Sequence, residues 1–147
     1  SQVGCAGRVV SFTETEDSRY LITLSGISRF HVIETLEAFD PYITAKVDWT
    51  AFKEDGRVEK LEGHFKRDHF LKTLSEYFTF ANLQTDWDSL KKAEDELLVN
   101  SLAILCPFDS NEKQALLEAK DIKERAEILL TLMEMSIRSE KNFGPLQ

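Results

Sequence analysis

Residues suited to catalysis or metal binding are few in this chain of 147 residues. Among its three histidines, His64 and His69 lie five positions apart, and neither belongs to a cysteine–histidine cluster of the kind that binds zinc. The sequence contains no Gly-x-Ser-x-Gly, no phosphate-binding glycine loop followed by Lys-Ser or Lys-Thr, and no dinucleotide-binding fingerprint. A serine–lysine pair stays open as an alternative, although no context marks one. We therefore predict no catalytic residue, no metal and no cofactor.

The charge of the chain narrows the class of partner. It has 26 acidic and 18 basic residues and a formal net charge of −8, and most of the acidic residues fall on the polar faces of predicted helices or in turns. Such a protein repels a phosphate backbone on average, so we predict no nucleic-acid partner. No apolar run approaches the roughly 20 residues of a membrane span, and there is no charged-then-apolar leader. We predict a cytoplasmic protein without a membrane partner, in which Cys5 and Cys106 are reduced.

The chain from Val3 to Val32 carries the pattern of a long β-hairpin, with the acidic loop TETEDS between its two arms. In the second arm, one alternating set of residues is apolar except at Gly26 and Ser28, so one face of the hairpin is predicted to be apolar. We expect a bend at Gly26, because glycine within a strand often marks a bulge or a corner. We expect the guanidinium of Arg29 to bond a backbone carbonyl or a carboxylate in a structural role, with contact to a ligand as the alternative.

A helical half follows the strands. A third strand is predicted over residues 42–49, and a short returning segment over 58–61. From about Arg67 the apolar period changes from two to near 3.6, which is typical of helices. The predicted helices cover residues 67–81, a short segment from 86, 94–105, a segment that begins after 109, and a final segment from about 122 to 138. The sequence therefore predicts an α+β protein, with an antiparallel β lobe over residues 1–66 and a helical lobe over residues 67–147.

Two further features of the helical half lead to predictions. Asp68, Asp109 and Asp121 stand where each would cap the start of a helix, and the last two are each followed three residues later by glutamate. In the final helix, Leu129 and Met133 lie on one apolar stripe, which we expect to be buried against the stripe of the 94–105 helix.

Four aromatic residues stand out in the sequence. Two do not fit the apolar stripes of the predicted helices, and two lie at or next to a predicted strand. Phe80 and Trp87 lie off the stripes of the helical half, Phe39 precedes the predicted third strand, and Tyr42 is the first residue of that strand. Exposed aromatic side chains are common at protein-binding surfaces. We therefore take these four residues as candidates for peptide binding, with burial in the core as the alternative.

The stretches GCAGRVVSFTETEDSRYLITLSGISRFHV, PYITAKVDW and LVNSLAILCPFDSNEKQALLEAKDIKERAEILLTLMEM resemble the Lon substrate-binding domain family, and within it the small stand-alone bacterial proteins built on that domain. The resemblance covers nearly the whole chain. It implies a PUA-like β pseudo-barrel followed by a helical bundle, which together form one domain. It also implies recognition of unfolded or tagged protein substrates without catalysis, because the ATPase module and the Ser-Lys protease module do not accompany it here.

The chain departs from the family pattern in one respect. The family's domain begins several dozen residues earlier, so the pseudo-barrel is expected to be incomplete at the N-terminus, with an open sheet edge. We expect a second copy of the chain or an N-terminal fragment to cover that edge. The alternatives left open are an RNA-binding module, which the net charge opposes, a hydrolase in its own right, and a fragment of a full-length ATP-dependent Lon protease.

Overall fold

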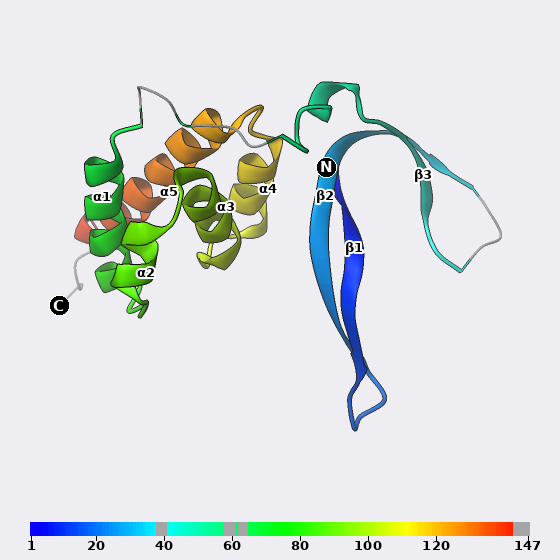
Figure 1. The fold of residues 1–147 in the computed structure, drawn as a ribbon, viewed down its shortest axis with the longest axis horizontal. Helices are drawn as coiled ribbons and strands as arrows, with labels where there is room; N and C mark the ends of the chain where they lie inside the picture. Colours follow the sequence, from blue (N-terminus) through cyan, green and yellow to red (C-terminus); the bar gives the residue numbers. More distant parts are fainter. Residues whose placement is uncertain (38–40, 58–60, 62–64, 143–147) are drawn as a thin grey trace. The chain divides into compact units, whose positions relative to one another are not determined.

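The computed structural model describes residues 1–37, 41–57, 61 and 65–142 of the chain. It divides into two compact units, Ser1–Val58 and Glu59–Gln147, which are described separately below. Within the described residues, the first unit holds a three-stranded antiparallel sheet and the second holds five α-helices (Figure 1). The predicted α+β class is thus confirmed. The predicted lobe boundary after residue 66 stays a prediction.

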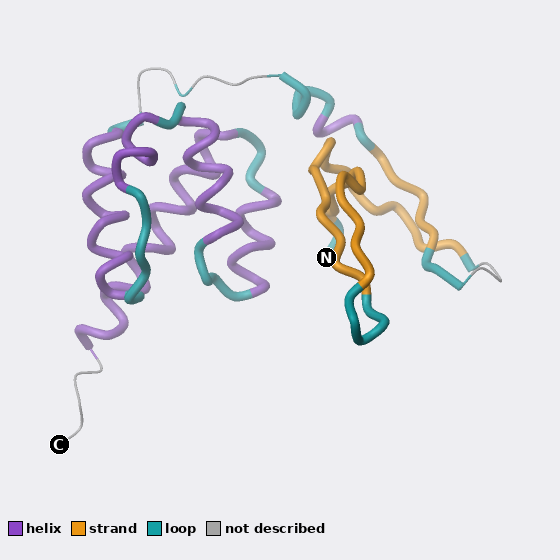
Figure 2. The backbone as a smooth tube through the Cα atoms, turned by 60° about the horizontal axis from the view of Figure 1, so that its bottom comes forward, coloured by secondary structure: helices purple, strands orange, loops and turns teal. Residues whose placement is uncertain are grey.

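The sheet has a long central strand that changes partners along its length. Its strands are β1 (Val3–Glu14), β2 (Tyr20–Leu36) and β3 (Thr44–Asp48), in the order β1-β2-β3. β1 pairs with β2 from Tyr20 to His31, whereas β3 pairs with it from His31 to Leu36. The far end of the β1–β2 hairpin is therefore a two-stranded ribbon (Figure 2). The predicted returning segment at 58–61 falls mostly outside the described residues.

The pairing of β1 with β2 is interrupted beside Gly26. Ala6 pairs with Ser28 and Gly7 pairs with Gly26, so Ile27 is an extra residue on β2 at this point. Gly4, on β1 nearby, allows the ring of Phe30 to pack closely against the backbone. A Cβ atom built on Gly4 would lie 2.7 Å from two ring carbons of Phe30, closer than real side chains approach. The base of the hairpin is therefore tightly packed where the ribbon begins.

The helices are α1 (Arg67–Phe80), α2 (Trp87–Lys92), α3 (Asp95–Leu105), α4 (Ser110–Glu118) and α5 (Ile122–Asn142). Asp109 forms a complete capping box with Glu112 at the start of α4, as its spacing predicts. Before α5, a carboxylate oxygen of Asp121 accepts a 2.8 Å hydrogen bond from the backbone N–H of Glu124. The prediction for Asp68 was wrong. The N-cap of α1 is Lys66, whose side chain makes no capping bond, and Asp68 lies inside the first turn.

The core of the helical unit lies between α1, α3 and α5. Leu129 and Met133 of α5 are fully buried, and they belong to one apolar cluster with Leu98 and Leu102 of α3, as predicted. α1 adds Phe70 and further residues to the same cluster. At the start of α1, the guanidinium of Arg67 pairs with Asp95 and donates a 2.7 Å hydrogen bond to the carbonyl of Ala93. These contacts fix the first turn of α1 against the start of α3.

Candidate functional site

One face of the hairpin ribbon is apolar and open to solvent. Cross-strand partners share a face of a sheet, and Ile22 pairs with Phe12 while Leu24 pairs with Val9. Tyr20 lies on the same face by alternation, and its ring stacks on that of Phe12 with centroids 5.0 Å apart. We call this surface the hairpin face; its residues are Val9, Phe12, Tyr20, Ile22 and Leu24. Each of the five side chains is between 48% and 63% exposed.

The opposite face of the ribbon is mostly polar. There Ser11 pairs with Thr23, and Arg8 pairs with Ser25. In the described part of the chain, β1 pairs only with β2, and β2 from Tyr20 to Ser28 pairs only with β1. Both edges of the ribbon therefore offer backbone groups to which an extended peptide is able to add as a strand. The ribbon thus combines an apolar surface with two open edges.

The base of the ribbon is held by a charged contact around Arg29. Its Nε and Nη2 atoms donate to the two carboxylate oxygens of Asp55, at 2.9 and 2.6 Å. The backbone N–H of Arg29 donates to the same carboxylate at 2.9 Å. The guanidinium also lies 4.4 Å from the ring centre of Phe52, a cation–π distance. Arg29 is buried, and these bonds join β2 to the turn that follows β3.

The aromatic candidates from the sequence are divided between the two units. Tyr42 belongs to the sheet unit and is 64% exposed. In the helical unit, Phe80 lies at the end of α1 and is partly exposed, with its ring 6.2 Å from that of Tyr77. Trp87 is half-buried and packs against the helical core. Phe39 lies outside the described residues. The three described candidates therefore have different surroundings, and Trp87 is the most strongly packed of them.

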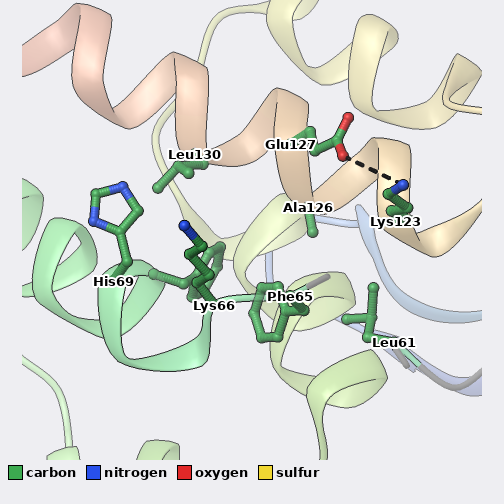
Figure 3. Close-up of a pocket in the computed structure, with 9 residues that line it drawn as sticks. Leu61, Phe65, Lys66, His69, Lys123, Ala126, Glu127 and Leu130 are labelled. Atoms are coloured by element: carbon green, nitrogen blue, oxygen red, sulfur yellow. Dashed lines mark ion pairs between the residues drawn. The ribbon is translucent and has the colours of Figure 1, made fainter. Parts of the chain in front are cut away.

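A concave feature lies within the helical unit, between the start of α1 and the first half of α5 (Figure 3). We call it the α1–α5 pocket, and its volume is about 140 Å³. Its apolar wall is formed by Leu61, Phe65, Phe70, Ala126 and Leu130. Four residues with ionisable side chains complete the lining, namely Lys66, His69, Lys123 and Glu127. The Nζ atom of Lys123 lies 4.0 Å from Oε1 of Glu127, and Nε2 of His69 lies 3.7 Å from Oε1 of Glu134.

The strongly shifted ionisable groups of the helical unit are held in their neutral forms. Burial raises the pKa of Cys106 to about 11 and that of Tyr77 to about 12. A buried thiol of this kind is a poor nucleophile at neutral pH, because the thiolate is the reactive form. In the part of the chain that the structure describes, no group of three or more His, Cys, Asp and Glu residues is placed to hold a metal ion.

Reasoning from the sequence found the alternation of the hairpin face but missed the α1–α5 pocket. The pocket is formed by segments more than fifty residues apart, so no local pattern marks it. One signal was present. Lys66 and Lys123 stand at the starts of helices, where the helix dipole favours acidic residues.

The described residues thus present an apolar ribbon face to solvent, and burial keeps Cys106 and Tyr77 neutral. The family model of the ATP-dependent protease La (LON) substrate-binding domain matches residues 1–135. The chain belongs to this family.

Two relatives extend the comparison. Lon protease from Dictyoglomus thermophilum is 29% identical over 136 residues, which cover 84% of this chain but only 16% of that protein. The crystal structure of a Lon N-terminal domain protein from Xanthomonas campestris superposes with a TM-score of 0.58 at 19% identity, over 89% of this chain and 68% of that one. At this identity the second comparison supports the fold alone. Within the described residues, no helix combines the length and apolar character needed to cross a lipid bilayer.

Proposed function

We propose that this chain recognises unfolded or apolar segments of polypeptides and does not cleave them. The observation that carries the proposal is the hairpin face, which presents five large apolar side chains to solvent. Membership of the LON substrate-binding domain family supports it. Because the chain spans only 16% of the Dictyoglomus thermophilum Lon protease, ATP-dependent proteolysis would require parts outside the matched region.

The physical basis of recognition is burial of apolar surface together with strand addition. Covering one large apolar side chain contributes about 1.5–3 kcal/mol. An extended peptide that pairs with an open edge of the ribbon also satisfies its own backbone groups. Such pairing depends little on sequence, whereas the hairpin face selects apolar side chains. This combination suits a binder of unfolded proteins, in which apolar segments are exposed.

The remaining sequence predictions fit this proposal. Tyr42 and Phe80 stay candidates for peptide contacts, and Phe39 and Trp87 remain in the predicted set. We place the protein in the cytoplasm, where unfolded chains would be its partners. An RNA-binding role is disfavoured, because the net charge of −8 would repel phosphates.

The test is a titration of the chain with a reduced and carboxymethylated model protein, followed by fluorescence anisotropy. We expect micromolar binding that Ile22→Asp weakens at least tenfold. Thr23→Asp is the matched control, because it places the same charge on the adjacent residue of the polar face. We also expect Ile22→Asp, and not Thr23→Asp, to reduce any self-association through the ribbon in sedimentation velocity. Equal binding by the two variants, or no binding by the unmodified chain, would refute the proposal.

A further inference from the structure

The α1–α5 pocket belongs to the helical unit, whereas the hairpin face belongs to the sheet unit, and the two differ in chemistry. The hairpin face is an open surface, whereas the pocket is a small concavity whose apolar wall is formed by α1, α5 and the segment before α1. Its volume of about 140 Å³ is close to that of an engineered apolar cavity that holds one benzene molecule. The pocket is therefore the right size for one leucine or phenylalanine side chain, and too small for a longer apolar segment.

The rim of the pocket is richer in positive than in negative charge. Among the described lining residues, Lys66 and Lys123 carry positive charge and Glu127 carries negative charge, and the imidazole of His69 lies 3.7 Å from the carboxylate of Glu134. Figure 3 shows Lys66 beside His69 on one side of the pocket, and Lys123 with Glu127 on the other. This local excess of positive charge is unusual in a chain whose formal net charge is −8. It favours an anionic group next to the apolar wall.

The positions of the two lysines within the fold reinforce this charge. Lys66 is the N-cap residue of α1, and Lys123 is the second residue of α5. Because the N-terminal end of a helix carries partial positive charge, both lysines add to it rather than offset it. Lys66 forms no ion pair with another described residue, and the contact between Lys123 and Glu127 is long and solvent-exposed. An incoming carboxylate would therefore not need to break a strong ion pair.

We propose that the α1–α5 pocket binds the C-terminal residue of a polypeptide, with its apolar side chain in the pocket and its α-carboxylate on Lys66. The inference rests on the proposed function, because it names the part of a polypeptide substrate that this second site takes. A C-terminal leucine or phenylalanine carries an apolar side chain and a carboxylate on the same α-carbon. An internal apolar residue lacks the charge, and an internal acidic residue lacks the apolar side chain. Lys123 adds to the field that favours the carboxylate.

The test compares labelled peptides that differ only at the C-terminus, measured by fluorescence anisotropy with the complete chain. We expect a peptide ending in leucine with a free carboxylate to bind at least fivefold more tightly than the same peptide ending in leucinamide. We expect replacement of the last leucine by serine to cause a similar loss. Lys66→Glu should abolish the preference for the free carboxylate. The matched control is Lys72→Glu, which makes the same change at an exposed position of α1 outside the pocket and should preserve the preference.

Each outcome separates this inference from the proposed function. Equal binding of acid and amide, or equal behaviour of Lys66→Glu and Lys72→Glu, overturns the pocket assignment even if the carboxymethylated protein still binds through the hairpin face. Binding of 4-methylpentanoate as tightly as the peptide acid also overturns it, because the site would then be one for small apolar acids. If the peptide acid binds as expected but the carboxymethylated protein does not bind, the proposed function fails and the pocket assignment stands.

Discussion

The two units of this chain treat apolar side chains in opposite ways. In the helical unit, Leu129 and Met133 are fully buried in a cluster to which several helices contribute. In the sheet unit, the hairpin face leaves side chains of similar size about half exposed. Helices have an apolar stripe on one side only and bury it by packing together, whereas a two-stranded ribbon has nothing of its own to cover its apolar face. Burial of apolar side chains is therefore concentrated in the helical unit, whereas the sheet unit exposes the hairpin face.

The largest expected effect tests the buried side of this comparison. Leu129→Ala should lower the free energy of unfolding of the helical unit by about 2–5 kcal/mol, because it leaves a cavity at a fully buried position. Ile22→Ala changes an exposed position of the hairpin face in the sheet unit. It should change the free energy of unfolding of the sheet unit by no more than about 0.5 kcal/mol. Chemical denaturation followed by far-ultraviolet circular dichroism measures both. Similar losses for the two variants would mean that the hairpin face is covered in solution.

A smaller effect is expected at the base of the ribbon. Arg29→Ala should lower local stability by about 1.5–3 kcal/mol, because it removes charge-assisted hydrogen bonds to a carboxylate whose side chain is only 16% exposed. Arg19→Ala is the control, because the ion pair of Arg19 with Asp17 is highly exposed, and solvent screens such pairs so that they contribute little. Hydrogen exchange of the β2 and β3 amides reports the difference. Unchanged protection in Arg29→Ala would show that the base is held by packing alone.

The smallest effect concerns pH and the start of α2. Hydrogen bonds from the Ser89 hydroxyl and backbone N–H, and then from the Asp88 N–H, lower the pKa of Asp86 in the folded chain. A carboxyl whose folded pKa is depressed stabilises the fold above its unfolded pKa, and this contribution is lost as the pH falls through the folded pKa. We therefore expect the backbone amide of Ser89 to lose its protection from hydrogen exchange only in acid, at pH values below the ordinary pKa of an aspartate side chain. In Asp86→Asn this step should be absent, and an unchanged pH profile would disprove the assignment.

The sequence predicted the features that depend on local chemistry. The capping box at Asp109 follows from two residues three apart, and burial of Leu129 and Met133 follows from their helical spacing. The irregularity beside Gly26 lies where a glycine within the predicted strand indicated a bend. These features need only neighbouring residues, so a single sequence contains the information.

The features that the sequence did not predict depend on long-range packing. Asp68 is a good N-cap residue by type, yet α1 begins two residues earlier than a cap at Asp68 allows. Arg67 there binds Asp95 and Ala93 of a distant segment. The pocket depends on the same packing, because it joins the start of α1 to α5. Local preference at Asp68 was outweighed by contacts that only the folded unit brings together.

The exchange of partners along β2 also determines how force passes through the sheet unit. The β1 and β3 ladders occupy different stretches of β2 and overlap only around His31. A load applied to the tip of the ribbon therefore reaches β3 through a short segment of one strand, beside the anchored Arg29. The two ladders are mechanically in series rather than in parallel, so the weaker one yields first. The β3 ladder is the shorter of the two, so such a load would separate β3 from β2 before it opened the whole ribbon.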